Sequence, residues 1–101
     1  MRLTSDQTHA IVSATRALAG NDARVWLFGS RLHDELRGGD IDLLVECAQP
    51  VARPVWLAAQ ITARLQRVLG DRRIDVLVID PATVVEPVHR VACTEGIVLQ
   101  P

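Results

Sequence analysis

The stretch RVWLFGSRLHDELRGGDIDLLVE, residues 24–46, decides the fold of this chain. Its two apolar runs, residues 24–28 and 41–46, are rich in the branched and aromatic side chains that favour buried strands. Between them, Gly29-Ser30 predicts a tight turn, followed by a short excursion that ends in a Gly-Gly turn. Successive side chains of a strand point to opposite faces. Asp40 and Asp42 are therefore expected side by side.

Acidic residues at these positions indicate a metal site. Two neighbouring carboxylates repel each other unless a cation lies between them, and hard divalent cations such as Mg²⁺ prefer oxygen ligands. Backbone N–H groups at a turn such as Gly29-Ser30 can bind phosphate oxygens. A third apolar run, residues 74–79, is interrupted only by Asp75, and a charge in an otherwise buried strand is costly unless it is paired or metal-bound. Three aspartates on adjacent strands predict two-metal phosphoryl-transfer chemistry.

One alternative exists for the third carboxylate. Asp80 precedes Pro81 at the expected end of a strand, where an aspartate usually begins a turn. Asp75 is therefore the favoured ligand. Arg72-Arg73, just before the same strand, is either a solvated strand entry or a contact for an acidic partner, and the sequence leaves both open.

The chain resembles the nucleotidyltransferases of the polymerase-β superfamily, whose signature is Gly-Ser, a spacer, Asp-x-Asp and a later Asp on a neighbouring strand. It is most similar to the minimal nucleotidyltransferases, small members often encoded beside a HEPN-domain toxin, and the likeness runs from about Arg24 to Leu99. The resemblance implies one minimal nucleotidyltransferase domain over residues 1–101, with two Mg²⁺ ions and ATP as the substrate. The implied catalytic and metal-binding residues are Asp40, Asp42 and Asp75, and the implied nucleotide-binding residues are Gly29, Ser30 and Arg31. For Arg31, a salt bridge to Asp34 or Glu35 is an equal alternative.

Hydrophobic periodicity and turn residues predict the order helix–strand–strand–helix–strand–helix–strand. The first helix is expected to begin with a capping box of Thr4 and Gln7 and to end at Gly20. The other expected elements are strands at residues 24–28, 41–46, 74–79 and 97–99, a long helix at 54–69, and short helices at 30–36 and 88–94. The expected buried faces are Ile11, Ala14, Thr15 and Leu18 on the first helix, and Leu57, Ile61, Leu65 and Val68 on the long one. We expect an α+β fold, a small mixed sheet with helices mainly on one face, and the resemblance implies the polymerase-β-like palm.

Composition narrows the class of protein further. A length of 101 residues, 49% of them apolar, predicts a single folded domain. No apolar run reaches the roughly 20 residues of a membrane span, and the N-terminus lacks a signal-peptide core, so a cytoplasmic protein is expected. A net charge of −1 argues against direct nucleic-acid binding. Cys47 and Cys93 are expected to be small buried hydrophobes. All eleven basic residues are Arg, and there is no Tyr.

Two hypotheses of function follow. The first is an enzyme that transfers AMP to a HEPN-type toxin, on a hydroxyl of that protein, because this chain is too short to hold its own acceptor-binding domain. The second is a binding module that masks its toxin without catalysis; a small-molecule nucleotidyltransferase is a weaker third. The partner is expected to be the toxin or a second copy of the chain. The expected interface is formed by residues 54–69 and 84–94, with Trp56 and Val88 as anchors.

Overall fold

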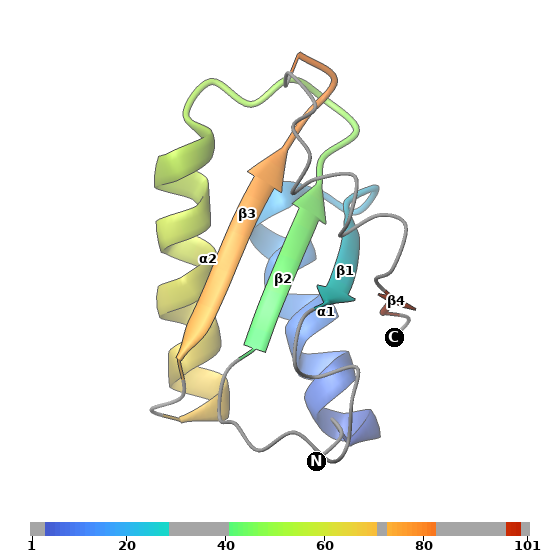
Figure 1. Ribbon diagram of the computed structural model, residues 1–101, viewed down its shortest axis with the longest axis vertical. Helices are drawn as coiled ribbons and strands as arrows, with labels where there is room; N and C mark the ends of the chain where they lie inside the picture. Colours follow the sequence, from blue (N-terminus) through green and yellow to red (C-terminus); the bar gives the residue numbers. More distant parts are fainter. Residues whose placement is uncertain (1–3, 29–40, 71–72, 83–96, 100–101) are drawn as a thin grey trace.

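The computed structural model describes residues 4–28, 41–70, 73–82 and 97–99, which form two helices and a four-stranded sheet (Figure 1). In chain order the elements are α1 (Ser5–Ala19), β1 (Arg24–Phe28), β2 (Ile41–Glu46), α2 (Pro54–Leu69), β3 (Ile74–Ile79) and β4 (Ile97–Val98). The predicted bounds of the first three strands and of the long helix are confirmed, and the last strand ends one residue earlier than expected. The short helices predicted at 30–36 and 88–94 lie outside the described residues.

Helix α1 begins and ends as the sequence predicts. The Thr4 hydroxyl accepts a hydrogen bond from the Gln7 amide (3.1 Å), and the Gln7 side chain accepts one from the Thr4 amide (2.9 Å). Gly20, with φ of 105°, follows the last turn, a conformation that glycine adopts without a steric penalty. The predicted buried face missed one residue, because Val12 is buried beside Ile11.

Helix α2 begins at Pro54, whose fixed φ and missing N–H suit the first position of a helix. Ile61 and Leu65 are fully buried, as expected. The prediction for Val68 was wrong: it is 50% exposed, and Leu69, four residues after Leu65, packs against the core instead.

The sheet has the strand order β3-β2-β1-β4 and is mixed. Strand β1 is antiparallel to both β2 and β4, whereas β2 and β3 are parallel and are connected through α2. Strand β1 lies inside the described sheet, between β2 and β4. Strand β3 is an edge strand of the described sheet with alternate residues exposed, so the expectation of an otherwise buried strand was wrong.

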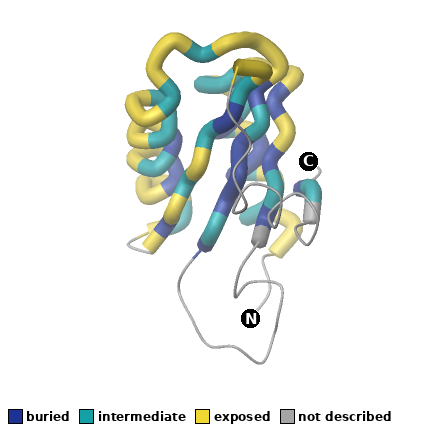
Figure 2. The backbone as a smooth tube through the Cα atoms, turned by 45° about the horizontal axis from the view of Figure 1, so that its top comes forward, coloured by how far each residue is buried: buried dark blue, intermediate teal, exposed yellow. Residues whose placement is uncertain are grey.

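The main core lies between the helices and one face of the sheet. Alternate β2 residues Ile41, Leu43 and Val45 are fully buried against the inward side chains of both helices. Figure 2 shows this division, with buried positions on the strands and exposed ones on the outer side of α2. On the opposite face, Leu44 and Ile79 form a second, smaller cluster that packs with the half-buried Trp26. The expected fold class, a mixed sheet with helices on one face, is confirmed.

Candidate active site

Two of the three predicted metal-binding aspartates lie directly opposite each other on parallel strands. Asp42 of β2 and Asp75 of β3 are Cα partners in the sheet register. Neighbouring strands are about 4.8 Å apart, and directly opposed side chains share a face. The residues before them, Ile41 and Ile74, are buried on the helix face. Because successive side chains of a strand point to opposite faces, Asp42 and Asp75 both lie on the face away from the helices.

The same register brings the end of β1 beside this pair. Phe28, the last residue of β1, is the Cα partner of Asp42. Gly29 follows Phe28 in the chain, and Asp40 precedes β2. The predicted site residues Gly29, Ser30, Arg31 and Asp40 themselves lie outside the described residues. The described strand ends that lead to them all meet at one end of the sheet, the lower end in Figure 1.

Asp75 is more exposed than the sequence suggested. Its side chain is 54% exposed and forms a salt bridge with Arg73, with the Arg73 Nε 3.4 Å from the Asp75 Oδ2. The expectation that Asp75 interrupts an otherwise buried strand was wrong, because alternate residues of β3, an edge strand of the described sheet, are exposed. Arg73 thus forms an ion pair within its own chain, from a position just before β3. Both sequence-based interpretations of Arg72-Arg73, a solvated strand entry and a contact for an acidic partner, stay predictions, and Arg72 lies outside the described residues.

The geometry of the aspartate pair fits a hard divalent cation. Two carboxylates on adjacent strands provide oxygen ligands on one face, and like charges at this spacing favour a bound cation. Within the part of the chain that the structure describes, no cluster of three or more acidic, His or Cys side chains surrounds a common point. Asp40, the predicted third ligand, is not among these residues.

A family model described as "Nucleotidyltransferase domain" matches residues 10–95, a range that includes both β2 and β3. The chain belongs to the nucleotidyltransferase domain family. A search of curated proteins found no match. Family membership confirms the coarse class suggested by the resemblance, a transferase of nucleoside monophosphates in a family that generally uses nucleoside triphosphates and divalent metals. Among the described helices, none is long and apolar enough to cross a membrane.

Asp80 has a structural role in this nucleotidyltransferase domain. Its carboxylate accepts hydrogen bonds from the backbone amides of Val51 and Ala82, the latter at 2.9 Å. These bonds close the turn after β3 and join it to the segment that precedes α2. The prediction that Asp80 begins a turn is confirmed. It lies after the last residue of β3, at the opposite end of that strand from Asp75.

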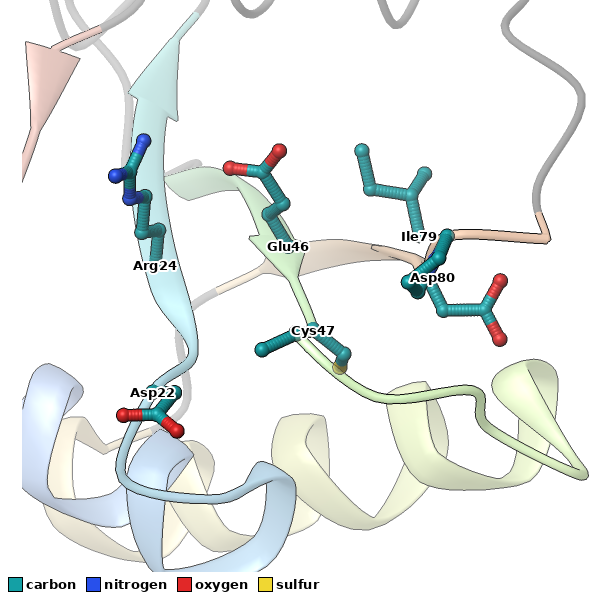
Figure 3. A pocket seen from close by; sticks show the side chains of 8 residues that line it. Asp22, Arg24, Glu46, Cys47, Ile79 and Asp80 are labelled. Carbon is teal, nitrogen blue, oxygen red and sulfur yellow. The ribbon is translucent and has the colours of Figure 1, made fainter.

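An open cavity of about 420 Å³ lies at this opposite end of the sheet (Figure 3). Arg24 and Glu46, which are Cα partners, lie side by side at its rim, four residues along each strand from Phe28 and Asp42. That separation is about 13 Å. The lining residues are Asp22, Arg24, Glu46, Cys47, Ala48, Ile79, Asp80 and Pro81. The cavity is therefore separate from the candidate active site, and sequence reasoning did not predict it.

Cys47 lies at the base of this cavity. Its side chain is buried, as expected, whereas Cys93 lies outside the described residues. Burial, and to a lesser degree the nearby charge of Asp80, raises the pKa of the Cys47 thiol above its ordinary value. The thiol is therefore neutral at physiological pH and a poor nucleophile.

Proposed function

We propose that this nucleotidyltransferase domain transfers AMP from ATP to a hydroxyl group of a partner protein. The observation that carries the proposal is the direct pairing of Asp42 and Asp75 across parallel strands in a chain of this family. Asp40 is proposed as the third carboxylate. Gly29, Ser30 and Arg31 are proposed as contacts of the triphosphate, which follows from the resemblance of their sequence pattern.

The proposed reaction is an in-line substitution at the α-phosphorus. The acceptor hydroxyl oxygen forms a bond to that phosphorus, the bond to the oxygen bridging to the β-phosphate breaks, and pyrophosphate leaves. Asp75, an exposed carboxylate, is proposed to accept the hydroxyl proton and pass it to solvent. Asp40, Asp42 and Asp75 would hold two Mg²⁺ ions, which supply charge neutralisation and a lower pKa of the acceptor hydroxyl.

The surface proposed to bind the acceptor protein begins at the first turn of α2. Val55 is 85% exposed and Trp56 is 55% exposed. The Arg53 guanidinium lies over the Trp56 ring, 5.5 Å from its centroid. These residues, with Pro54 and Ala59, line a shallow cavity of about 370 Å³. Trp56, expected as an interface anchor, lies outside the core and is proposed as an anchor for the partner. The other expected anchor, Val88, lies outside the described residues.

This surface is continuous with the edge of β3. A second cavity, of about 290 Å³, is lined by α2 residues Pro54, Val55 and Ala58 and by residues 76–78 of β3. Leu77, exposed in this cavity, lies two residues from Asp75 on the same face of the strand. A protein that covers Val55 and Leu77 therefore extends toward the carboxylate at which the acceptor hydroxyl is proposed to react.

Charge indicates what kind of partner fits. Helix α2 contains no acidic residue, and three exposed arginines, Arg53, Arg64 and Arg67, lie at its start and along it. Two copies of α2 in contact would bring these arginines together, so a partner with an apolar and acidic contact face fits better. We propose that this partner is the HEPN-type toxin suggested by the resemblance, rather than a second copy of the chain.

Modification is proposed to occur on the partner. The chain contains no Tyr, so if the acceptor hydroxyl belongs to a tyrosine, that tyrosine must come from another protein. The test is the intact mass of this protein and of the product of the adjacent gene after incubation with ATP and Mg²⁺, with the Asp75→Asn variant as control. We expect the partner, and not this chain, to gain the mass of one or more AMP groups. This gain should occur with the wild-type enzyme and not with Asp75→Asn.

The other outcomes select between the alternatives. A stable complex without any gain in mass would favour the masking module. A gain in mass on this chain would contradict transfer to a partner. Absence of both a complex and a modified partner would leave the small-molecule transferase.

A further inference from the structure

Arg73 stands beside the candidate active site with a permanent positive charge. The Arg73 carbonyl accepts a hydrogen bond from the Ile41 amide (2.9 Å), which extends the pairing of β2 and β3 and fixes the Arg73 backbone next to the start of β2. The Arg73 side chain is 72% exposed, and its Nε lies 3.4 Å from the Asp75 Oδ2. Because residues two apart on a strand share a face, the guanidinium lies on the side that carries Asp42 and Asp75.

Two other described arginines form interactions in different parts of the molecule. Arg53 lies over Trp56, and the Arg16 side chain donates to the Ala23 carbonyl at 3.3 Å. Arg24 lies at the opposite end of the sheet, beside Glu46. A guanidinium does not lose its proton in proteins. In the metal-free protein, the Arg73 guanidinium therefore provides a permanent positive charge beside Asp75.

We propose that Arg73 is a resident counter-cation that competes with divalent metal for Asp75 and makes metal binding depend on the nucleotide. The inference rests on the metal site of the proposed function. An exposed ion pair is weak, so a divalent cation can displace the guanidinium from Asp75. The positive charge of Arg73 nevertheless repels a metal that arrives alone. A triphosphate brings negative charge that offsets both cations, so metal and nucleotide bind with positive coupling.

Arg73 acts here as a positioning residue, because its effect passes through the carboxylate of Asp75. In the metal-free protein, Arg73 holds the Asp75 carboxylate in place. Its positive charge also weakens the binding of a metal ion when no nucleotide is present. The consequence is a site that binds metal weakly until a nucleoside triphosphate is present.

The test is the affinity for Mn²⁺, measured by calorimetric titration with Mn²⁺ alone and then in the presence of a non-hydrolysable ATP analogue. The variants are Arg73→Gln, which removes the charge, and Arg73→Lys, which keeps it. Arg24→Gln is the matched control: it removes the same charge from an exposed position at the other end of the sheet. Because Arg73 is exposed, none of these changes is expected to prevent folding, which thermal melts will check.

For Arg73→Gln we expect Mn²⁺ alone to bind about two- to fivefold more tightly than to wild type, the range that corresponds to an exposed ion pair. The gain in Mn²⁺ affinity on adding the ATP analogue should be smaller than in wild type. Arg73→Lys and Arg24→Gln should behave like wild type. Unchanged or weaker binding of Mn²⁺ to Arg73→Gln, or an equal effect of Arg24→Gln, would overturn the inference.

The same titration separates this inference from the proposed function. If wild type binds Mn²⁺ and Asp75→Asn does not, the metal site stands and only the Arg73 comparison decides the inference. If neither wild type nor Asp75→Asn binds Mn²⁺ with the analogue present, the metal site of the proposed function fails, and the inference fails with it.

Discussion

Replacing Asp75 and Asp80 one at a time should separate metal binding from stability. Asp75 lies on an adjacent strand to Asp42, about 4.8 Å away. Two unit charges at about 5 Å repel by about 0.8 kcal/mol in water and by about 3 kcal/mol near a protein surface; since Asp75 is half exposed, about 1 kcal/mol is appropriate. The Arg73 ion pair contributes about 0–1 kcal/mol in the opposite sense. The metal-free Asp75→Asn variant should therefore unfold with a free energy within about 1 kcal/mol of wild type.

Asp80→Ala should behave in the opposite way. It removes an ionised acceptor from the Val51 and Ala82 amides, and hydrogen bonds to a charged group contribute about 1.5–3 kcal/mol each. Because Asp80 is only half-buried, we expect a loss of about 2–3 kcal/mol in total, which is about 8–24 °C in Tm for a domain of this size.

The assay is urea denaturation for stability and thermal melting with and without Mg²⁺ and ATP for binding. A ligand that binds only the folded state raises the Tm. We expect Asp75→Asn to keep its metal-free stability and lose the Tm shift caused by Mg²⁺ and ATP. Asp80→Ala should lose stability and keep the shift. If Asp80→Ala abolishes the shift while Asp75→Asn retains it, the carboxylates have been assigned to the wrong ends of β3.

Three further predictions concern other parts of the molecule. Leu44→Ala should lower the free energy of unfolding by about 2–5 kcal/mol, as for a fully buried leucine, although Leu44 faces away from both helices; a loss below about 1 kcal/mol in urea denaturation would show that this face is open to water. The raised pKa of the Cys47 thiol should make the free energy of unfolding fall as the pH rises above 9.0, because the thiol ionises first in the unfolded state, and no Lys or Tyr titrates in the same range. Cys47→Ala should flatten this slope, and an unchanged slope would contradict the raised pKa of Cys47. Trp56→Ala should leave the Tm nearly unchanged and weaken binding of the acceptor protein by tenfold or more, about 1.4 kcal/mol, in calorimetric titration, whereas equal binding would exclude Trp56 as an anchor.

The sequence predicted the strand bounds well because the strands alternate side chains between two environments. In β2, Ile41, Leu43 and Val45 had to face the helices, and this requirement placed Asp42 on the other face. The capping residues Thr4 and Gln7 likewise act within one turn, so local sequence was sufficient to find the start of α1. Features determined by neighbours in the chain could therefore be predicted from the amino-acid sequence alone.

Features determined by the order of strands could not be predicted in this way. The apolar sequence of β3 is compatible with both a central and an edge strand, and only the order β3-β2-β1-β4 shows that Asp75 and Leu77 are exposed. The pairing of Asp42 with Asp75 depends on the register of two strands separated in the chain by α2, and one residue of slip would have placed the carboxylates on opposite faces. Val68 shows a further limit, because Val68 and Leu69 both follow Leu65 at helical spacing and only the packing shows that Leu69 contacts the core.

The central claim, nucleotidyl transfer to a partner protein at the Asp42 and Asp75 pair, is tested most directly by following the two ends of ATP. The protein and the product of the adjacent gene are incubated with Mg²⁺ and ATP labelled either on the α-phosphate or on the γ-phosphate. We predict that the α-label becomes covalently bound to the partner, that the γ-label is released as pyrophosphate, and that Asp42→Asn and Asp75→Asn abolish both results. Transfer of the γ-label to the partner, or α-labelling that survives both substitutions, would contradict the claim.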